Sequence, residues 1–207
     1  ISSEFFNIFT ITDGDSATAT FELKQASPST AGTDPFFIVT NTEGFSVKFT
    51  GKSDGTTNGT LLGVDVSITT AVQPFGILEF AFAMGAAASN NTTIVASNIA
   101  EVVLSGFSTL ETPGINGISF ESDDADIFPE IFFTQILAGP EGNTDITYNL
   151  QMEEMINGTP PSAFTGGSGE LLPNGSIGFV ALEETITTYQ LVEQGTNATI
   201  NVMEEVL

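Results

Sequence analysis

Phe45-Ser46-Val47-Lys48-Phe49-Thr50 is the stretch that decides the fold class. Its apolar and polar residues alternate one by one, which is the period of a β-strand with one buried face. The same alternation recurs over residues 19–24, 62–68, 78–84 and 146–153. Less regular strands are expected over residues 3–12, 35–41, 116–121, 130–138, 176–182, 185–193 and 197–206. The sequence therefore predicts an all-β protein of about ten strands.

Turn-forming clusters, and not helices, separate the expected strands. Glycine, asparagine, aspartate and proline gather at Asp13-Gly14-Asp15, Asn58-Gly59 and Pro173-Asn174-Gly175, where they favour tight turns. Only residues 92–104 could form a helix, and their β-branched side chains weaken that prediction. Short strands joined by turns are typical of an antiparallel β-sandwich or a jelly roll, here with at most one short helix.

The domain organisation is expected to be simple. A single β-sandwich domain covers residues 13–207, and an N-terminal strand over residues 1–12 precedes it. The region 157–169 is rich in proline and glycine. We interpret it as a surface loop of that domain, with an interdomain linker as the alternative.

The residue types that are missing exclude most enzyme chemistry. The chain has no arginine, histidine, cysteine or tryptophan, and its only cations are Lys24, Lys48 and Lys52. A Ser-His-Asp triad, a Cys-His pair and a zinc site of the Cys/His type are therefore impossible. Paired carboxylates could hydrolyse a glycoside, but the tyrosine platforms that sugars favour are limited to Tyr148 and Tyr189. We predict that the protein is not an enzyme.

Charge and composition bound the partners and the compartment. The formal net charge of −23 disfavours nucleic acid and anionic membranes, which bind lysine and arginine. The longest apolar run, residues 75–87, is interrupted by Glu79 and is shorter than the roughly 20 residues of a membrane span. A chain poor in nitrogen-rich side chains and sulfur is economical to lose outside the cell. With a first residue, Ile1, that fits signal-peptide removal, we expect an extracellular or cell-surface protein.

The N-terminal strand is apolar on both faces. Its two sets of apolar side chains are Phe5, Phe9 and Ile11 on one face, and Phe6 and Ile8 on the other. Such a strand is either central in its own sheet or a donor that completes the sheet of a neighbouring copy. Head-to-tail donation that does not close a ring builds an open filament. The C-terminal strand, residues 198–207, is the alternative donor.

Two acidic loops offer oxygen ligands for Ca²⁺, the one cofactor that the sequence suggests. The denser loop holds Asp123, Asp124 and Asp126, with Glu130 close by, and the second is the turn that holds Asp13 and Asp15. Neither loop has the spacing of an EF-hand, and a solvated acidic loop is the alternative interpretation.

Glycan attachment is a further expectation. Asn-X-Ser/Thr sequons begin at Asn58, Asn90, Asn91, Asn157, Asn174 and Asn197. Proline lies beside the sequons of Asn157 and Asn174, which weakens those two.

These observations favour a secreted structural subunit. It would self-assemble by strand donation into a pilus-like filament, a surface coat or a matrix, with further copies of itself as its partners. The alternative is a calcium-dependent adhesin or glycan-binding β-sandwich that uses the acidic loop. A jelly-roll capsid protein and a glycoside hydrolase are more distant readings.

Overall fold

The computed structural model describes residues 8–10, 14–30, 32–84, 91–110, 112–120, 128–169 and 199–201. Its strands are β1 (Ile8–Thr10), β2 (Thr18–Glu22), β3 (Phe36–Thr40), β4 (Ser46–Lys52), β5 (Leu61–Asp65), β6 (Ile77–Ala83), β7 (Ile115–Phe120), β8 (Glu130–Gln135), β9 (Ile146–Tyr148) and β10 (Thr199–Asn201). Its helices are α1 (Thr92–Ser108), α2 (Leu150–Met155) and the 3-10 helix η1 (Pro140–Gly142). The described chain is mostly β with few helices, as the alternation predicts.

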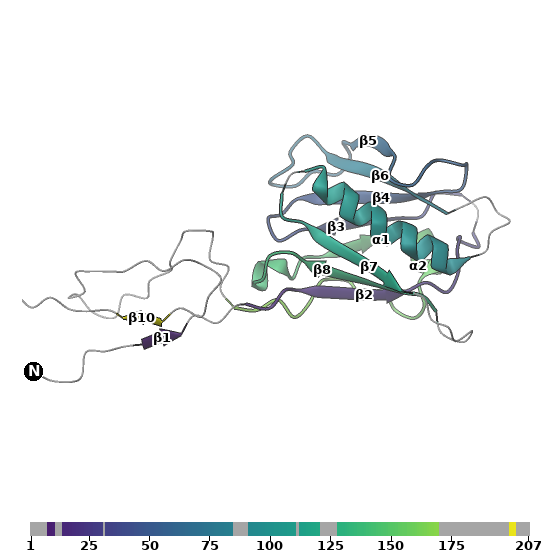
Figure 1. Ribbon diagram of the computed structural model, residues 1–207. Helices are drawn as coiled ribbons and strands as arrows, with labels where there is room; N and C mark the ends of the chain where they lie inside the picture. Colours follow the sequence, from purple (N-terminus) through teal and green to yellow (C-terminus); the bar gives the residue numbers. More distant parts are fainter. Residues whose placement is uncertain are drawn as a thin grey trace, which may run out of the picture.

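Eight of the strands form two sheets (Figure 1). One sheet has the order β5-β6-β4-β3-β9, and the other has the order β2-β8-β7. β1 and β10 pair with each other as a separate two-stranded sheet. The two main sheets therefore hold fewer strands than the ten or so expected, and the strands expected over 176–182 and 185–193 lie outside the described residues.

The core lies between the two sheets and beneath α1. Phe37 and Phe49 are cross-strand partners, so their rings share one face of the five-stranded sheet and stack at 5.3 Å between centroids. Phe37 also meets Phe21 of the other sheet edge to face at 6.0 Å, and Phe21 lies 5.4 Å from Phe133. All four rings are buried. Such aromatic pairs contribute about 0.5–1.5 kcal/mol each beyond the burial of their area.

One strand pairing contradicts the antiparallel expectation. β6 inserts between β5 and β4 and runs parallel to β4, with Phe80 beside Phe49 and Phe82 beside Gly51. A Cβ at Gly51 would lie 2.7 Å from Cζ of Phe82, so the Phe82 ring needs a glycine here. Alternation shows which side chains share a face and carries no information on strand order. The pattern therefore could not predict that β6 lies between β5 and β4 or that it runs parallel to β4.

Helix α1 is the largest departure from the expected sandwich. It is longer than the expected 92–104, and it packs against β7, β6, β8 and β4 (Figure 1). The Asn91 side-chain oxygen caps it by accepting from the N–H groups of Thr93 and Ile94 at 3.0 and 3.2 Å. Val95, Ile99, Val102 and Val103 share its buried face, so packing outweighs the weak propensity of its β-branched residues. The body is a pair of sheets covered by a helix, and not clearly a closed sandwich.

Helix α2 replaces the end of the strand expected over 146–153. The strand stops at Tyr148 because Asn149 caps a helix instead, with its Oδ1 accepting from the N–H of Met152 at 3.0 Å. Met152 and Met155 are both buried. Their spacing suits one face of a helix as well as alternation suits a strand, and the cap decides between the two.

A strand-like segment, residues 162–165, joins the edges of the two main sheets. The Ser162 carbonyl accepts from the N–H of Ile146, the first residue of β9, at 2.9 Å. Three residues later, Thr165 exchanges two main-chain hydrogen bonds with Thr18 of β2, at 2.8 and 2.9 Å. The segment therefore leaves one sheet and enters the other, and it ties them together on the side opposite α1.

Candidate functional site

A cluster of exposed apolar side chains is the most unusual surface of the described chain. Six of the eleven large apolar side chains that are exposed there lie on β5 and on the connection that follows it. We call them the apolar edge: Leu61, Leu62, Val64, Val66, Val72 and Phe75. Phe75 is 87% exposed and Val66 is 74% exposed. Single exposed apolar residues are ordinary, but six of them within residues 61–75 make this edge a candidate interaction surface.

The apolar edge is held in place by its own connection. The Gln73 side chain accepts from the N–H of Ser46 at 2.6 Å, and its main-chain N–H donates to the Thr70 hydroxyl at 2.9 Å. Gly76 brings this connection back to β5, where a Cβ at Gly76 would lie 2.8 Å from Cγ1 of Val64. The side chains are therefore exposed on a hydrogen-bonded framework next to an edge strand.

The run of sequence that holds the apolar edge carries little charge. Residues 55–78 contain one charged residue, Asp65, in a chain with a formal charge of −23. The Lys48 ammonium binds Asp65 at 2.8 Å and Glu79 at 3.3 Å, and it lies 4.6 Å from the centroid of the Phe36 ring. The hydrogen bond from Lys48 is the main reason that the pKa of Asp65 is lowered to about 2. Burial opposes the charge on Lys48, but these two carboxylates raise its pKa.

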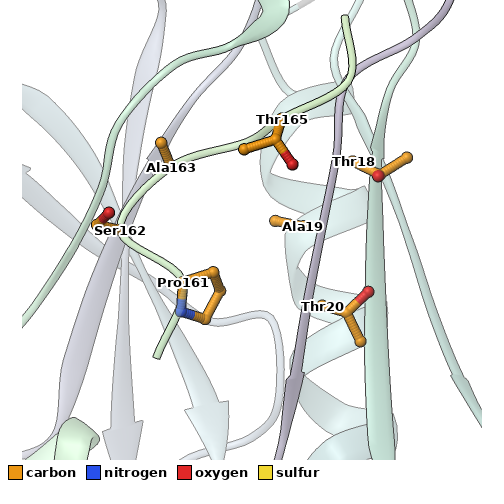
Figure 2. Close-up of a pocket in the computed structure, with 7 residues that line it drawn as sticks. All are labelled: Thr18, Ala19, Thr20, Pro161, Ser162, Ala163 and Thr165. Carbon is orange, nitrogen blue, oxygen red and sulfur yellow. The ribbon is translucent and has the colours of Figure 1, made fainter. Parts of the chain in front are cut away.

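A cavity with an uncharged lining lies beside β2. It has a volume of about 460 Å³ and lies between β2 and the segment that joins the sheets (Figure 2). Its lining comprises Thr18, Ala19, Thr20, Pro161, Ser162, Ala163 and Thr165. None of these side chains carries a charge, so the lining supplies hydroxyl and apolar groups but no carboxylate or amine.

The proposed donor residues fall only partly within the described chain. Ile8 and Phe9 lie in β1, opposite Asn201 and Ile200 of β10, in an antiparallel pair. Phe5, Phe6 and Ile11 lie outside the described residues. The pairing joins the two ends of the chain, and β1 makes its principal contacts with β10 among the described elements.

The predicted calcium ligands are not brought together among the described residues. Asp13, Asp123, Asp124 and Asp126 lie outside them. The Asp15 carboxylate accepts from the Ser168 hydroxyl at 2.8 Å, and Glu130 lies opposite Glu22 in the β2–β8 ladder. Within the described part of the chain, no three acidic side chains gather in a group that could hold a metal ion.

Three of the predicted glycan acceptors are described, and each uses its side chain structurally. Asn58 donates from Nδ2 to Glu101 at 3.1 Å and to the Asn98 carbonyl at 3.2 Å. Asn157 donates from Nδ2 to Glu22 at 2.8 Å. Asn91 uses its oxygen as the α1 cap, which leaves its nitrogen out of those bonds. The remaining acceptors, Asn90, Asn174 and Asn197, lie outside the described residues.

Sequence reasoning missed both the apolar edge and the cavity. The alternation of Leu62, Val64 and Val66 was interpreted as a half-buried strand, yet the apolar side of β5 is exposed. The available sequence signal for the apolar edge was the run over residues 55–78, in which Asp65 is the one charged residue. The cavity depends on contacts between residues far apart in the sequence, so no local pattern predicts it.

Comparisons with known proteins found no match to this chain. No family model matches the chain, and no curated protein or solved structure is significantly similar to it. None of the helices in the described part combines the length and apolarity needed to cross a membrane.

Proposed function

We propose that the protein is a secreted structural subunit that assembles with copies of itself into a filament, coat or matrix. In this assembly, the apolar N-terminal strand of one copy lies on the apolar edge of the next. The observation that carries the proposal is the apolar edge, a formed and exposed surface on an edge strand. Nitrogen-sparing composition supports export from the cell, where bulk material is lost.

Energetics favour a partner for this surface. Burying a Val, Leu or Phe side chain contributes about 1.5–3 kcal/mol. Association costs roughly 4–15 kcal/mol in lost translational and rotational freedom, so several such side chains must be buried together. The apolar edge supplies six of them, of which Leu62 and Val72 are less than half exposed, at 38% and 44%.

Two charge-poor stretches of the chain allow contact between copies in spite of the net charge. Two copies repel each other through most of their surface because each carries a formal charge of −23. The donor strand over residues 1–12 has one charged residue, Glu4, and the run that forms the apolar edge has only the paired Asp65. These two stretches can meet at little electrostatic cost.

The geometry of β5 indicates how the contact would be made. The ladder of β5 with β6 is irregular between Leu61 and Gly63, and such bulges weaken an edge as a template for a continuous new ladder. Burial of side chains, more than main-chain pairing, would therefore hold the donor strand. Donor and acceptor are different surfaces, so the contact is heterologous and can extend into an open filament.

The test is an assembly measurement on matched variants. Wild type, a variant lacking residues 1–12, and Val66→Ser with Phe75→Ser are followed by sedimentation and by electron microscopy. We expect fibres or large assemblies from the wild type and monomers from both variants. Phe128→Ser with Leu150→Ser is the control, because these side chains are 38% and 62% exposed outside the apolar edge.

The outcomes separate the parts of the proposal. Assembly that survives deletion of residues 1–12 but not the double serine variant would remove the donor and keep the acceptor. Assembly that survives both, or a wild type that stays monomeric at high concentration, would end the proposal.

A further inference from the structure

The cavity beside β2 is a place where a hydrogen-bonded ladder is interrupted. Successive residues of a strand direct their main-chain groups to opposite sides. Ala17 and Leu23 bond to the β8 side, through Gln135 N–H to the Ala17 carbonyl at 2.9 Å and Leu23 N–H to the Pro129 carbonyl at 3.0 Å. Thr18, Thr20 and Glu22 therefore direct their N–H and C=O groups to the other side, toward the cavity.

Bonds on that side close both ends of the cavity. At one end, Thr18 exchanges two main-chain bonds with Thr165, at 2.8 and 2.9 Å. At the other end, the Glu22 carbonyl accepts from Asn157 N–H at 2.8 Å. Thr20 lies between them, and among the described main-chain bonds none joins it to the facing segment. A strand could not thread through a gap that is closed at both ends, so the space suits a small molecule.

The residue that should face Thr20 is held in place by the bonds of its two neighbours on the β9 side. Antiparallel register from the Thr18–Thr165 pair places Ala163 opposite Thr20. Ala163 is drawn toward β9, where its neighbours bond through Ile146 N–H to Ser162 and Phe164 N–H to Thr144, both at 2.9 Å. In that arrangement the N–H and C=O of Ala163 itself point back toward β2. Thr20 and Ala163 therefore present two donors and two acceptors to one cavity, which both residues line.

We propose that this cavity binds one unit of a neutral carbohydrate. Neighbouring hydroxyls of a sugar both donate and accept, so they can satisfy main-chain groups of both kinds, which an apolar ligand would leave without partners. Ionic ligands gain nothing here, because the lining carries no charge. Ala163 and Pro161 offer apolar surface to the C–H faces of a sugar, and Figure 2 shows Pro161 on the segment that faces β2. The volume of about 460 Å³ lies in the range of small-molecule sites.

The experiment is a titration of the ¹⁵N-labelled full chain, observed by amide NMR at a concentration where sedimentation shows monomers, or in the Val66→Ser with Phe75→Ser background where the wild type assembles. The probes are glucose, galactose, mannose and N-acetylglucosamine, each added separately, with glucuronate as the charged arm. We expect saturable shifts of the Thr20 and Ala163 amides with at least one neutral sugar, and no saturable shift with glucuronate. Ala163→Leu fills the cavity and should abolish the shifts, whereas Ala71→Leu, the same change on an exposed connection, should keep them.

A second readout keeps the test decisive if Ala163→Leu fails to fold. In the wild type, a saturating neutral sugar should slow hydrogen exchange of the Thr20 and Ala163 amides. No saturable shift at these amides with any neutral sugar overturns the proposal. Shifts that persist in a folded Ala163→Leu variant, or equal binding of glucuronate, overturn it as well.

Discussion

The aromatic cluster between the sheets and the apolar edge on β5 are built from the same kind of sequence, with opposite outcomes. Phe37 lies on a strand covered by the second sheet and is fully buried, whereas Phe75 follows a strand that nothing in the described chain covers and is 87% exposed. Alternation predicts which side chains share a face. Whether another layer covers that face depends on strand order and on α1, which the pattern does not contain.

The largest effect is expected from the covered side. Phe37→Ala removes a ring that contacts Phe21, Phe49 and Phe133, and it should lower the free energy of unfolding by about 3–5 kcal/mol. Urea unfolding measures the loss. Phe75→Ala is the matched control and should stay within about 0.5 kcal/mol of the wild type. Comparable losses in the two variants would erase the distinction between the regions.

The packing of α1 on the core gives the next effect. A Cβ at Gly106 would lie 2.8 Å from Cε1 of Phe49, whose ring is fully buried and cannot move aside. Gly106→Ala should therefore destabilise the fold by about 1–3 kcal/mol, although alanine favours a helix over glycine by about 1 kcal/mol. Ser97→Ala, on the exposed side of the same helix, is the control. A stabilised Gly106→Ala variant would show that the helix does not press on Phe49.

The Asp65–Lys48 pair at the border of the apolar edge should make the stability of the fold depend on pH. The pKa of Asp65 is lowered to about 2 from its ordinary value of 3.8, so the folded state prefers the charged carboxylate. Its contribution is present above pH 3.8 and is lost as pH falls toward 2. The two side chains are partly buried, and with the effect reduced by solvent screening we expect about 1 kcal/mol. Lys48→Met should flatten this part of the stability profile measured by urea unfolding at each pH, and an unchanged slope would contradict the role of the pair.

The cap of α1 gives the smallest effect. Asn91→Ala removes the acceptor for two N–H groups at the start of the helix and should cost about 1 kcal/mol in thermal or urea unfolding. Asn91→Asp keeps an acceptor and should retain most of the stability, while both variants destroy the sequon. If aspartate were as damaging as alanine, the loss would belong to the glycan site and not to the cap.

Much of the fold could be predicted from local pattern. The positions of β2, β3, β4 and β6, and the apolar face of α1, follow from alternation and from the spacing of Val95, Ile99 and Val102. The parallel insertion of β6 could not be predicted, because it depends on order and not on period. The end of β9 was missed because the Asn149 cap competes with an alternating pattern that continues through Met152.

The candidate sites were less accessible to prediction. The donor strand rests on a local property, a strand apolar on both faces, and stays a prediction. The apolar edge and the interrupted ladder at Thr20 arise from residues that nothing covers or that are bonded elsewhere. Such features depend on long-range contacts, here between residues 18 and 165 and between 145 and 163.

The ion pairs of β4 also affect digestion of the chain by proteases. Lys48 is held by Asp65 and Glu79, and Lys52 is held by Asp34 at 2.5 Å, both within a strand that has neighbours on each side. From residue 53 onward there is no basic residue at all. A trypsin-like enzyme therefore finds one readily exposed cleavage point, after Lys24, and the fold withholds the other two. Digestion of the folded chain by a trypsin-like protease should therefore begin after Lys24 and leave the bonds after Lys48 and Lys52 intact.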